Sequence, residues 1–180
     1  MKSDVIVLTW LEADQIEHDY ELENFSVNLN SKGRGRGIAT YTNTMFQHVK
    51  NINAGDYSMS MMSSEKVDVF GIYRSKEGDL SDMMRKLSDH ISKRKTTIIG
   101  GDFNVCIMKN PKNIVTEKLK ELKFQQVVIQ ATHTEGGLID HLYIKKGGIG
   151  KDCSWNLEVS PKYYSDHDCI GITLSESKKN

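Results

Sequence analysis

Strand-like runs follow one another through the first 73 residues, and no helical pattern separates them. They cover residues 4–8, 25–29, 37–41, 46–49, 57–61 and 67–73. Residues 25–29 (FSVNL) alternate apolar and polar side chains, which is the period of a half-buried strand. Consecutive strands without crossover helices predict antiparallel pairing. This half of the chain therefore predicts sheets joined by hairpins.

The hydrophobic period changes after residue 78. Leu80, Met83, Met84 and Leu87 recur at helical spacing, which predicts an amphipathic helix over residues 79–92 with Asp79 as its N-cap. A second helix is predicted over residues 113–122. The remaining predicted strands are residues 96–99, 127–129, 138–144 and 169–174. Many strands with few helices predict two packed sheets with helices outside.

Composition restricts the function classes. The chain has 180 residues with 24 Lys+Arg and 24 Asp+Glu, so its formal net charge is zero, unlike proteins that bind nucleic acid through bulk positive charge. It contains no apolar run of about 18 residues and no secretory signal pattern, and its three cysteines form no C-x-x-C pair. We expect one domain over residues 1–174 with a polar tail at 175–180, in a nuclear or cytoplasmic protein that is not secreted and does not bind membranes.

Three polar clusters stand beside or within predicted strands. They are GDFN at 101–104, DH at 140–141 and SDHD at 165–168. Phosphodiester hydrolysis requires a cation, an activated water and stabilisation of the leaving oxygen, and Mg²⁺ prefers carboxylate oxygens. Histidine is the natural base near neutral pH when a carboxylate orients it. Each cluster alone is also compatible with a turn or a structural histidine, so their joint occurrence carries the interpretation.

In that order, GGDFN, GLIDHLYI and YYSDHDCIGI resemble motifs of the endonuclease/exonuclease/phosphatase superfamily. The resemblance covers residues 4–174 and is strongest to the apurinic-type endonuclease domains of non-LTR retrotransposons and related mobile elements. The segments GIYR at 71–74, DVIVLTWL at 4–11 and RGRGI at 34–38 also resemble segments of that branch. The resemblance implies a four-layer α/β sandwich, in which two mainly antiparallel sheets pack face to face between outer helices.

The resemblance also assigns roles. Asp102 would contact or deprotonate the attacking water, and Asn104 would hold that water or a phosphate oxygen. His167 would bind the scissile phosphate, oriented by Asp140 or a neighbour, and chemistry alone leaves open whether Asp102 or His167 is the base. Tyr73 would touch the phosphate. Asp166 would help to hold the cofactor, Mg²⁺ or alternatively Mn²⁺.

The implied substrate is DNA, contacted through its phosphate backbone. The candidates for this contact are Arg34 and Arg36 in a glycine-rich turn, and Arg74. A reverse transcriptase or helicase of the same mobile element is the implied protein partner. His133 and His141 are interpreted as structural or supporting residues, and Trp155 as a residue of the core or its rim.

Two features depart from the family pattern. The first strand of the family, which ends in a site asparagine, is missing, so we expect a domain incomplete at its N-terminus. Trp10 stands where a metal-binding glutamate is expected, and Glu12 is the substitute candidate two residues further on. Two strand positions displace a carboxylate by about 6.6 Å. The alternatives are therefore an inactive remnant of the fold, or a phosphoesterase acting on lipid or inositol phosphates.

Overall fold

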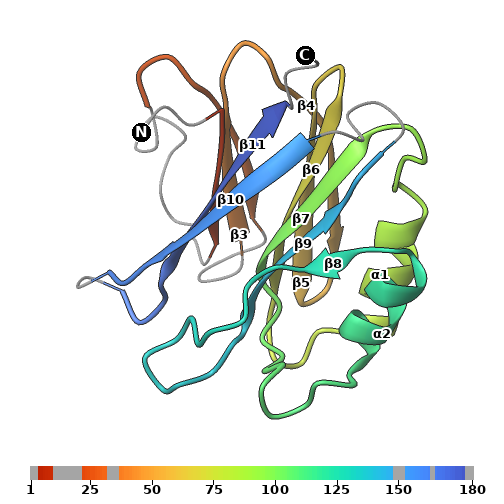
Figure 1. Cartoon of the computed structure of the whole chain (residues 1–180), viewed down its shortest axis with the longest axis vertical. Coiled ribbons are helices and arrows are strands. Elements are labelled where there is room, and N and C mark those ends of the chain that lie inside the picture. The colour runs from red at the N-terminus through yellow and green to blue at the C-terminus, as the bar shows by residue number, and fades with distance from the viewer. Residues whose placement is uncertain (1–3, 10–21, 32–36, 148–152, 163–164, 177–180) are drawn as a thin grey trace.

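The structure is a computed structural model that describes residues 4–9, 22–31, 37–147, 153–162 and 165–176. In chain order its elements are β1 (Val5–Thr9), β2 (Ser26–Ser31), β3 (Gly37–Thr42), β4 (Gln47–Ala54), β5 (Tyr57–Ser63), β6 (Val67–Arg74), α1 (Leu80–Ser88), β7 (Thr96–Asp102), α2 (Ile114–Glu121), β8 (Gln125–Gln126), β9 (Asp140–Lys145), β10 (Cys153–Ser160) and β11 (Cys169–Glu176). They form a sandwich of two sheet layers (Figure 1). Within the described ranges, no helix is long and apolar enough to cross a membrane.

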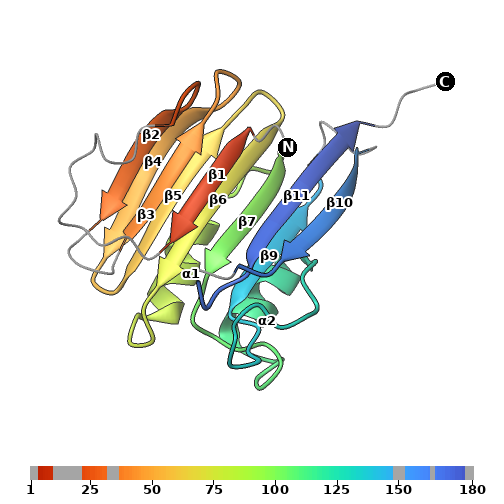
Figure 2. The same cartoon turned by 90° about the vertical axis from the view of Figure 1, so that its left-hand side faces the viewer.

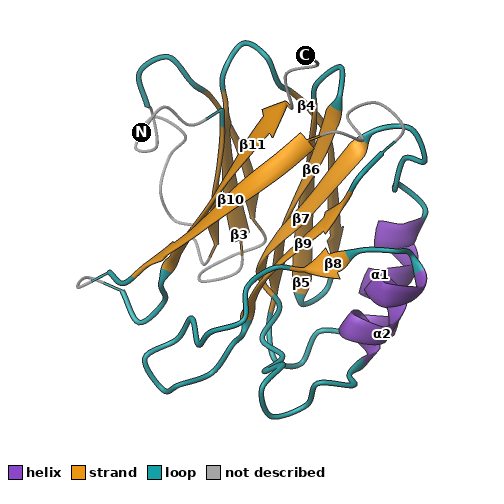
Figure 3. Ribbon diagram, viewed as in Figure 1, coloured by secondary structure: helices purple, strands orange, loops and turns teal. Residues whose placement is uncertain are grey.

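One layer is a six-stranded sheet with the order β4-β5-β6-β7-β9-β8. Its neighbours pair antiparallel except β6 and β7, which are parallel because the connection through α1 returns the chain to the same end of the sheet. Both helices lie on the outer face of this sheet (Figure 3). There Phe70 and Ile72 pack with Met83, Leu87 and Leu119 in the main core.

The other layer consists of two separate pieces. The sheet β1-β3-β2 and the hairpin β10-β11 lie side by side over the inner face of the six-stranded sheet (Figure 2). The hairpin contributes Leu157, Ile170 and Ile172 to a second core, which includes Ile98 and Leu142 of the large sheet. In this layer β1 pairs only with β3, and β11 pairs only with β10, within the described residues.

The predicted sandwich of mainly antiparallel sheets is confirmed. The predicted helix over 79–92 is shorter, ending at Ser88, and Asp79 caps it by accepting hydrogen bonds from the N–H groups of Ser81 and Asp82. Both described helices cover the same sheet, so the described part of the chain contains no helical layer on the opposite side.

Two predictions of strands were wrong. Residues 127–129 are not a strand, because pairing with β9 ends after Gln126 and Ile129 is 86% exposed. Strand β10 was missed, although Cys153, Trp155, Leu157 and Val159 alternate with polar residues and their side chains are the more buried ones. The alternation predicts a half-buried strand and was available in the sequence.

Candidate active site

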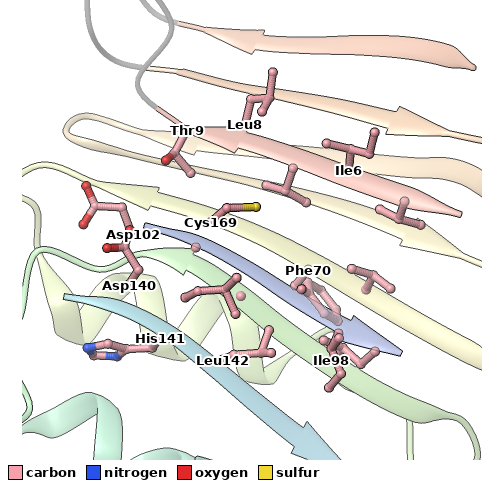
Figure 4. A pocket seen from close by; sticks show the side chains of 18 of the residues that line it. Ile6, Leu8, Thr9, Phe70, Ile98, Asp102, Asp140, His141, Leu142 and Cys169 are labelled. Atoms are coloured by element: carbon pink, nitrogen blue, oxygen red, sulfur yellow. The ribbon is translucent and has the colours of Figure 1, made fainter. Parts of the chain in front are cut away.

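Tyr73, Asp102 and Asp140 form a row across the end of the large sheet. Tyr73 is the register partner of Asp102 between β6 and β7, and Asp102 is the partner of Asp140 between β7 and β9. All three side chains are nearly buried and line one cavity. The row forms because β6 and β7 end where β9 begins. Figure 4 shows Asp102 and Asp140 together at this edge, near Thr9 of β1.

The GDFN segment turns sharply to present Asp102. Gly101 has φ 139°, and a Cβ there would lie 1.9 Å from the Ile72 carbonyl oxygen, so only glycine fits. Asn104 adopts φ 51° and closes the turn, donating from its backbone N–H to Asp102 Oδ1 over 2.8 Å. Its side-chain Nδ2 donates to Asp102 Oδ2 over 3.0 Å and to the Arg74 carbonyl oxygen over 2.7 Å. Asn104 is thus placed to hold Asp102 in one orientation.

His167 reaches the row from the other layer of the sandwich. Its Nδ1 lies 2.9 Å from Asp140 Oδ2 and 3.0 Å from Oδ1, and this geometry fits donation of the Nδ1 proton to the carboxylate. Thr132 donates its hydroxyl proton to Asp140 Oδ2 over 2.8 Å. The N–H of Asp168 donates to the Thr132 carbonyl oxygen, which fixes the segment that carries His167. Asp140 therefore orients His167 and leaves its Nε2 for other contacts.

The pKa values of Asp102 and His167 are both raised, but by different causes. Burial, and then the charge of Asp140, raise the pKa of Asp102 from 3.8 to about 6. The hydrogen bond with Asp140 raises the pKa of His167 above 6.5, against the opposing effect of burial. A carboxylate that can still take a proton near neutrality thus lies beside an imidazole that favours its charged form.

His133, interpreted from the sequence as a structural or supporting residue, lies against His167, and Thr132, which sequence reasoning did not single out, contacts Asp140. His133 and His167 form an isolated β-bridge, and their rings lie perpendicular with centroids 4.9 Å apart. His133 Nε2 is 3.4 Å from Asp166 Oδ2, while its Nδ1 accepts the N–H of Glu135. A usable signal was the polar THTEGG turn at 132–137, which leads directly into Asp140.

His141 is structural, as interpreted from the sequence. Its ring is fully buried and stacks on Phe103 with centroids 4.6 Å apart, and its Nε2 lies 2.7 Å from the Val105 carbonyl oxygen. Burial lowers the pKa of His141 to about 4, so the ring is neutral at physiological pH. His141 thereby supports the loop that follows Asp102.

Arg74 lies differently from the predicted DNA contact. The residue is 4% exposed, and its guanidinium donates to the carbonyl oxygens of Ser75 and Lys76. These bonds secure the turn after β6, so the side chain faces the protein interior instead of a solvent-accessible strand of DNA. Glu12, Arg34 and Arg36 lie outside the described residues.

Among the residues that the structure describes, two groups of side chains could hold a metal ion. In one, ligand atoms of Asp102, Asp140 and His167 lie within 4.8 Å of one another, and in the other those of His133, Asp166 and His167 do. The predicted metal ligand Asp166 has a side chain 66% exposed, at the mouth of the site. The two groups share His167.

The site opens into a cavity of about 2000 Å³. Its polar end contains the row and His167. The rest extends between β1 and β11 over the large sheet.

Comparison with known proteins shows which solved structures share this architecture. No protein-family model and no curated protein sequence matches the chain. Among solved structures, the endonuclease domain of TRAS1, a telomere-specific non-LTR retrotransposon, superposes with a TM-score of 0.63 at 12% identity, covering 88% of this chain and 81% of that domain. D. rerio TDP2, humanized by 14 mutations, gives a TM-score of 0.64 at 10% identity, covering 96% and 85%. An endonuclease/exonuclease/phosphatase family protein from Leptotrichia buccalis gives 0.59 at 12% identity, covering 96% and 87%.

The chain has the endonuclease/exonuclease/phosphatase fold. The resemblance stated from the sequence is confirmed at the level of this fold. At these identities the likeness concerns architecture, so catalytic roles must come from the site itself.

Proposed function

We propose that this protein hydrolyses phosphodiester bonds of DNA with Mg²⁺ as cofactor, Mn²⁺ being the alternative ion. One observation carries the proposal: buried Asp102 and the Asp140-oriented His167 line the same cavity from opposite layers of the sandwich. Attack by water on a phosphodiester needs a base and a positively charged group that binds the phosphate. Asp102 and the charged imidazole of His167 supply them on two sides of one cavity.

The residues divide the chemistry as follows. Asp102, whose pKa of about 6 leaves it mostly ionised at pH 7.5, takes a proton from the attacking water. The water oxygen bonds to phosphorus while the P–O ester bond breaks, and the leaving oxygen is protonated by solvent. His167 in its charged form holds a phosphoryl oxygen through Nε2, and Asn104 keeps Asp102 aligned. Tyr73 lies beside Asp102 in the row and lines the same cavity.

The residues fit a hard divalent cation. Asp102, Asp140 and Asp166 supply carboxylates around His167. Arg74, which follows the register partner of Asp102, has its guanidinium bonded to backbone carbonyls. The charge of Asp140 contributes to the raised pKa of Asp102, and a cation would relieve this repulsion. When bound, the ion offsets negative charge on the phosphoryl group. Asp102 and Asp140, whose ligand atoms lie in one group with His167, would hold it, with substrate oxygens completing the shell.

DNA as the substrate is supported by the structural neighbours. One is a retrotransposon endonuclease domain, and another is D. rerio TDP2 in complex with a single-strand DNA product. The mobile-element type, and a reverse transcriptase or helicase partner, belong to the same proposal and are supported by the sequence motifs.

The test is nicking of supercoiled plasmid with Mg²⁺ and with EDTA. We expect Mg²⁺-dependent nicking that falls at least about 100-fold in Asp102→Asn and His167→Ala. Asp68→Asn is the matched control. Asp68 is as buried as Asp102, but it lies on β6 at the end far from Tyr73 and the site. Unchanged nicking in both site variants would refute the assignment.

A second candidate function is DNA binding without cleavage by the same fold. The observation in its favour is that both carboxylate oxygens of Asp102 already accept hydrogen bonds from Asn104. It predicts DNA binding in a gel-shift assay, no Mg²⁺ heat in calorimetry and no nicking by any variant.

A further inference from the structure

His133 stands directly opposite His167 in a short antiparallel bridge between residues 132–134 and 166–168. Two backbone hydrogen bonds, of 2.8 and 2.9 Å, hold these segments together. Residues opposed in an antiparallel pair project their side chains to the same side, so the two rings meet, perpendicular, with centroids 4.9 Å apart. Both rings line the cavity that contains Asp102. The backbone therefore places a second imidazole at the site.

The turn after His133 fixes which of its ring nitrogens carries the proton. The N–H of Glu135 donates to His133 Nδ1 over 3.1 Å, so Nδ1 presents its lone pair and the neutral ring carries its proton on Nε2. The N–H of Gly136 closes the turn by donating to the His133 carbonyl oxygen over 2.8 Å. In this tautomer Nε2 offers no lone pair to a metal ion. His133 is therefore a hydrogen-bond donor through Nε2.

The Nε2 atoms of both histidines face one carboxylate. His133 Nε2 lies 3.4 Å from Asp166 Oδ2, and His167 Nε2 lies 4.0 Å from Asp166 Oδ1. The side chain of Asp166 is 66% exposed, so its carboxylate can turn toward solvent, whereas that of His133 is only 16% exposed. A phosphoryl oxygen is an acceptor with the same sign of charge as a carboxylate oxygen. The carboxylate thus marks a place where the two Nε2 atoms can receive an anionic oxygen.

We propose that His133 is a further catalytic residue, whose Nε2–H donates to one non-bridging oxygen of the scissile phosphate while His167 holds the other. The proposal rests on the proposed phosphodiester hydrolysis and adds a second donor to that site. A phosphodiester has two non-bridging oxygens, so two adjacent imidazoles supply one donor to each. These oxygens carry negative charge in the transition state, which a donor placed beforehand stabilises. His133 gives up no proton, and the bonds formed and broken at phosphorus are unchanged.

Two substitutions separate donation from ring contact. His133→Phe keeps a ring against His167 but has no donor, whereas His133→Gln loses the ring but keeps an N–H donor near the position of Nε2. In plasmid nicking with Mg²⁺, we expect kcat/KM to fall about 10- to 100-fold in His133→Phe, the effect of losing a hydrogen bond to a charged group. His133→Gln should keep most of the wild-type value. A role only in packing against His167 predicts the reverse order.

The control for these variants is His48→Phe, at an exposed position on β4. It should nick plasmid like the wild type. Melting temperatures of the three variants show whether each one folds.

A binding measurement tests the same contact without cleavage. The probe is dimethyl phosphate, the smallest phosphodiester, titrated into the ¹⁵N-labelled full chain with Mg²⁺. Long-range ¹H–¹⁵N spectra should show the proton of the neutral His133 ring on Nε2 in the free chain. The Nε2 resonances of His133 and His167 should then move together to saturation, while those of His48 should not. His133→Phe should raise the Kd for dimethyl phosphate about tenfold.

The two measurements separate failure of this proposal from failure of the proposed hydrolysis. If the wild type nicks plasmid but His133→Phe nicks equally, or His133→Gln loses more activity than His133→Phe, the donor role is overturned and hydrolysis stands. If the wild type does not nick but dimethyl phosphate moves both rings, the phosphate contact of His133 stands and hydrolysis falls. An Nδ1 proton on the neutral His133 ring, or a titration in which its Nε2 resonance does not move, overturns the proposal.

Discussion

At the scale of single residues, Asp102 is a carboxylate whose charge is opposed by its surroundings. Its folded-state pKa is raised to about 6 from 3.8, so between these values the folded state binds more protons than the unfolded state. The free energy of unfolding therefore falls as pH rises through this window and stays lower above it. The residue that the proposed chemistry needs thus destabilises the fold at neutral pH.

We predict that Asp102→Asn stabilises the metal-free protein while it removes activity. The pKa shift corresponds to about 3 kcal/mol, and we expect about 1–2 kcal/mol, because the new amide would face the Asn104 Nδ2 donor. Urea unfolding with EDTA should show the gain at pH 7.5 and little gain near pH 4. A variant less stable than the wild type at pH 7.5 would contradict this account of Asp102.

The raised pKa of His167 reflects a favourable pairing with Asp140, whereas that of Asp102 reflects unfavourable burial. Its pKa is raised mainly by the hydrogen bond with Asp140, so the stabilisation from this pair is fully present below about pH 6.5 and is lost as pH rises through the folded pKa. We predict that Asp140→Asn lowers the pKa of His167, because the hydrogen bond that raises it most is weakened while burial remains. NMR titration of the ring protons measures it. Asp166→Asn is the control and should shift this pKa less, since Asp166 Oδ1 is 4.0 Å away and exposed.

At the scale of elements, the end of β7 depends on Gly101. We predict that Gly101→Ala costs more than about 3 kcal/mol of unfolding free energy, because its Cβ would overlap the Ile72 carbonyl of β6. Gly136→Ala is the matched control. Its φ is also positive, at 76°, but nothing lies within 4 Å, so we expect a cost of about 1 kcal/mol. Equal costs in urea unfolding would mean that the contact with β6 is unimportant.

The elements were predictable where one face of each is buried. α1 and β6 have periodic apolar positions that pack in one core, and the sequence pattern identified both. Gln125–Gln126 carries no such pattern, because its pairing with β9 is set by the preceding helix and turn. Tertiary contact therefore decides the elements that pattern cannot.

The site was predictable in its motifs but less so in its contacts. Asp102, Asp140 and His167 were proposed because their motifs occur together, in the order of the superfamily that the sequence resembles, at or within predicted strands. The contacts of His133 and Thr132 with the site depend on a pairing between residues 132–134 and 166–168, which joins segments distant in sequence. Arg74 is the last residue of β6, and the sequence does not indicate that its guanidinium donates to the backbone carbonyl oxygens of the following turn.

At the scale of the whole molecule, the site joins the two layers of the sandwich. Asp102 and Asp140 belong to the large sheet, and His167 and Asp166 precede the hairpin strand of the other layer. A cation bound among these side chains would link the layers, and any ligand that binds only the folded state stabilises it.

We therefore predict that Mg²⁺ raises the melting temperature of the wild-type chain. The rise should grow with Mg²⁺ concentration and disappear on addition of EDTA, and the added free energy of unfolding should reach about 2.7 kcal/mol at 100 times the Kd. Asp102→Asn should start from a higher melting temperature in EDTA but gain almost nothing from Mg²⁺, because it lacks the buried carboxylate. Asp68→Asn, in contrast, should start from a lower melting temperature, since Lys95 loses its carboxylate partner, and should keep the full Mg²⁺ increment. Differential scanning fluorimetry separates these cases. It measures both the melting temperature in EDTA and its rise with Mg²⁺, and the two variants change these quantities in opposite ways. An equal increment in Asp102→Asn and the wild type would place the ion away from this row.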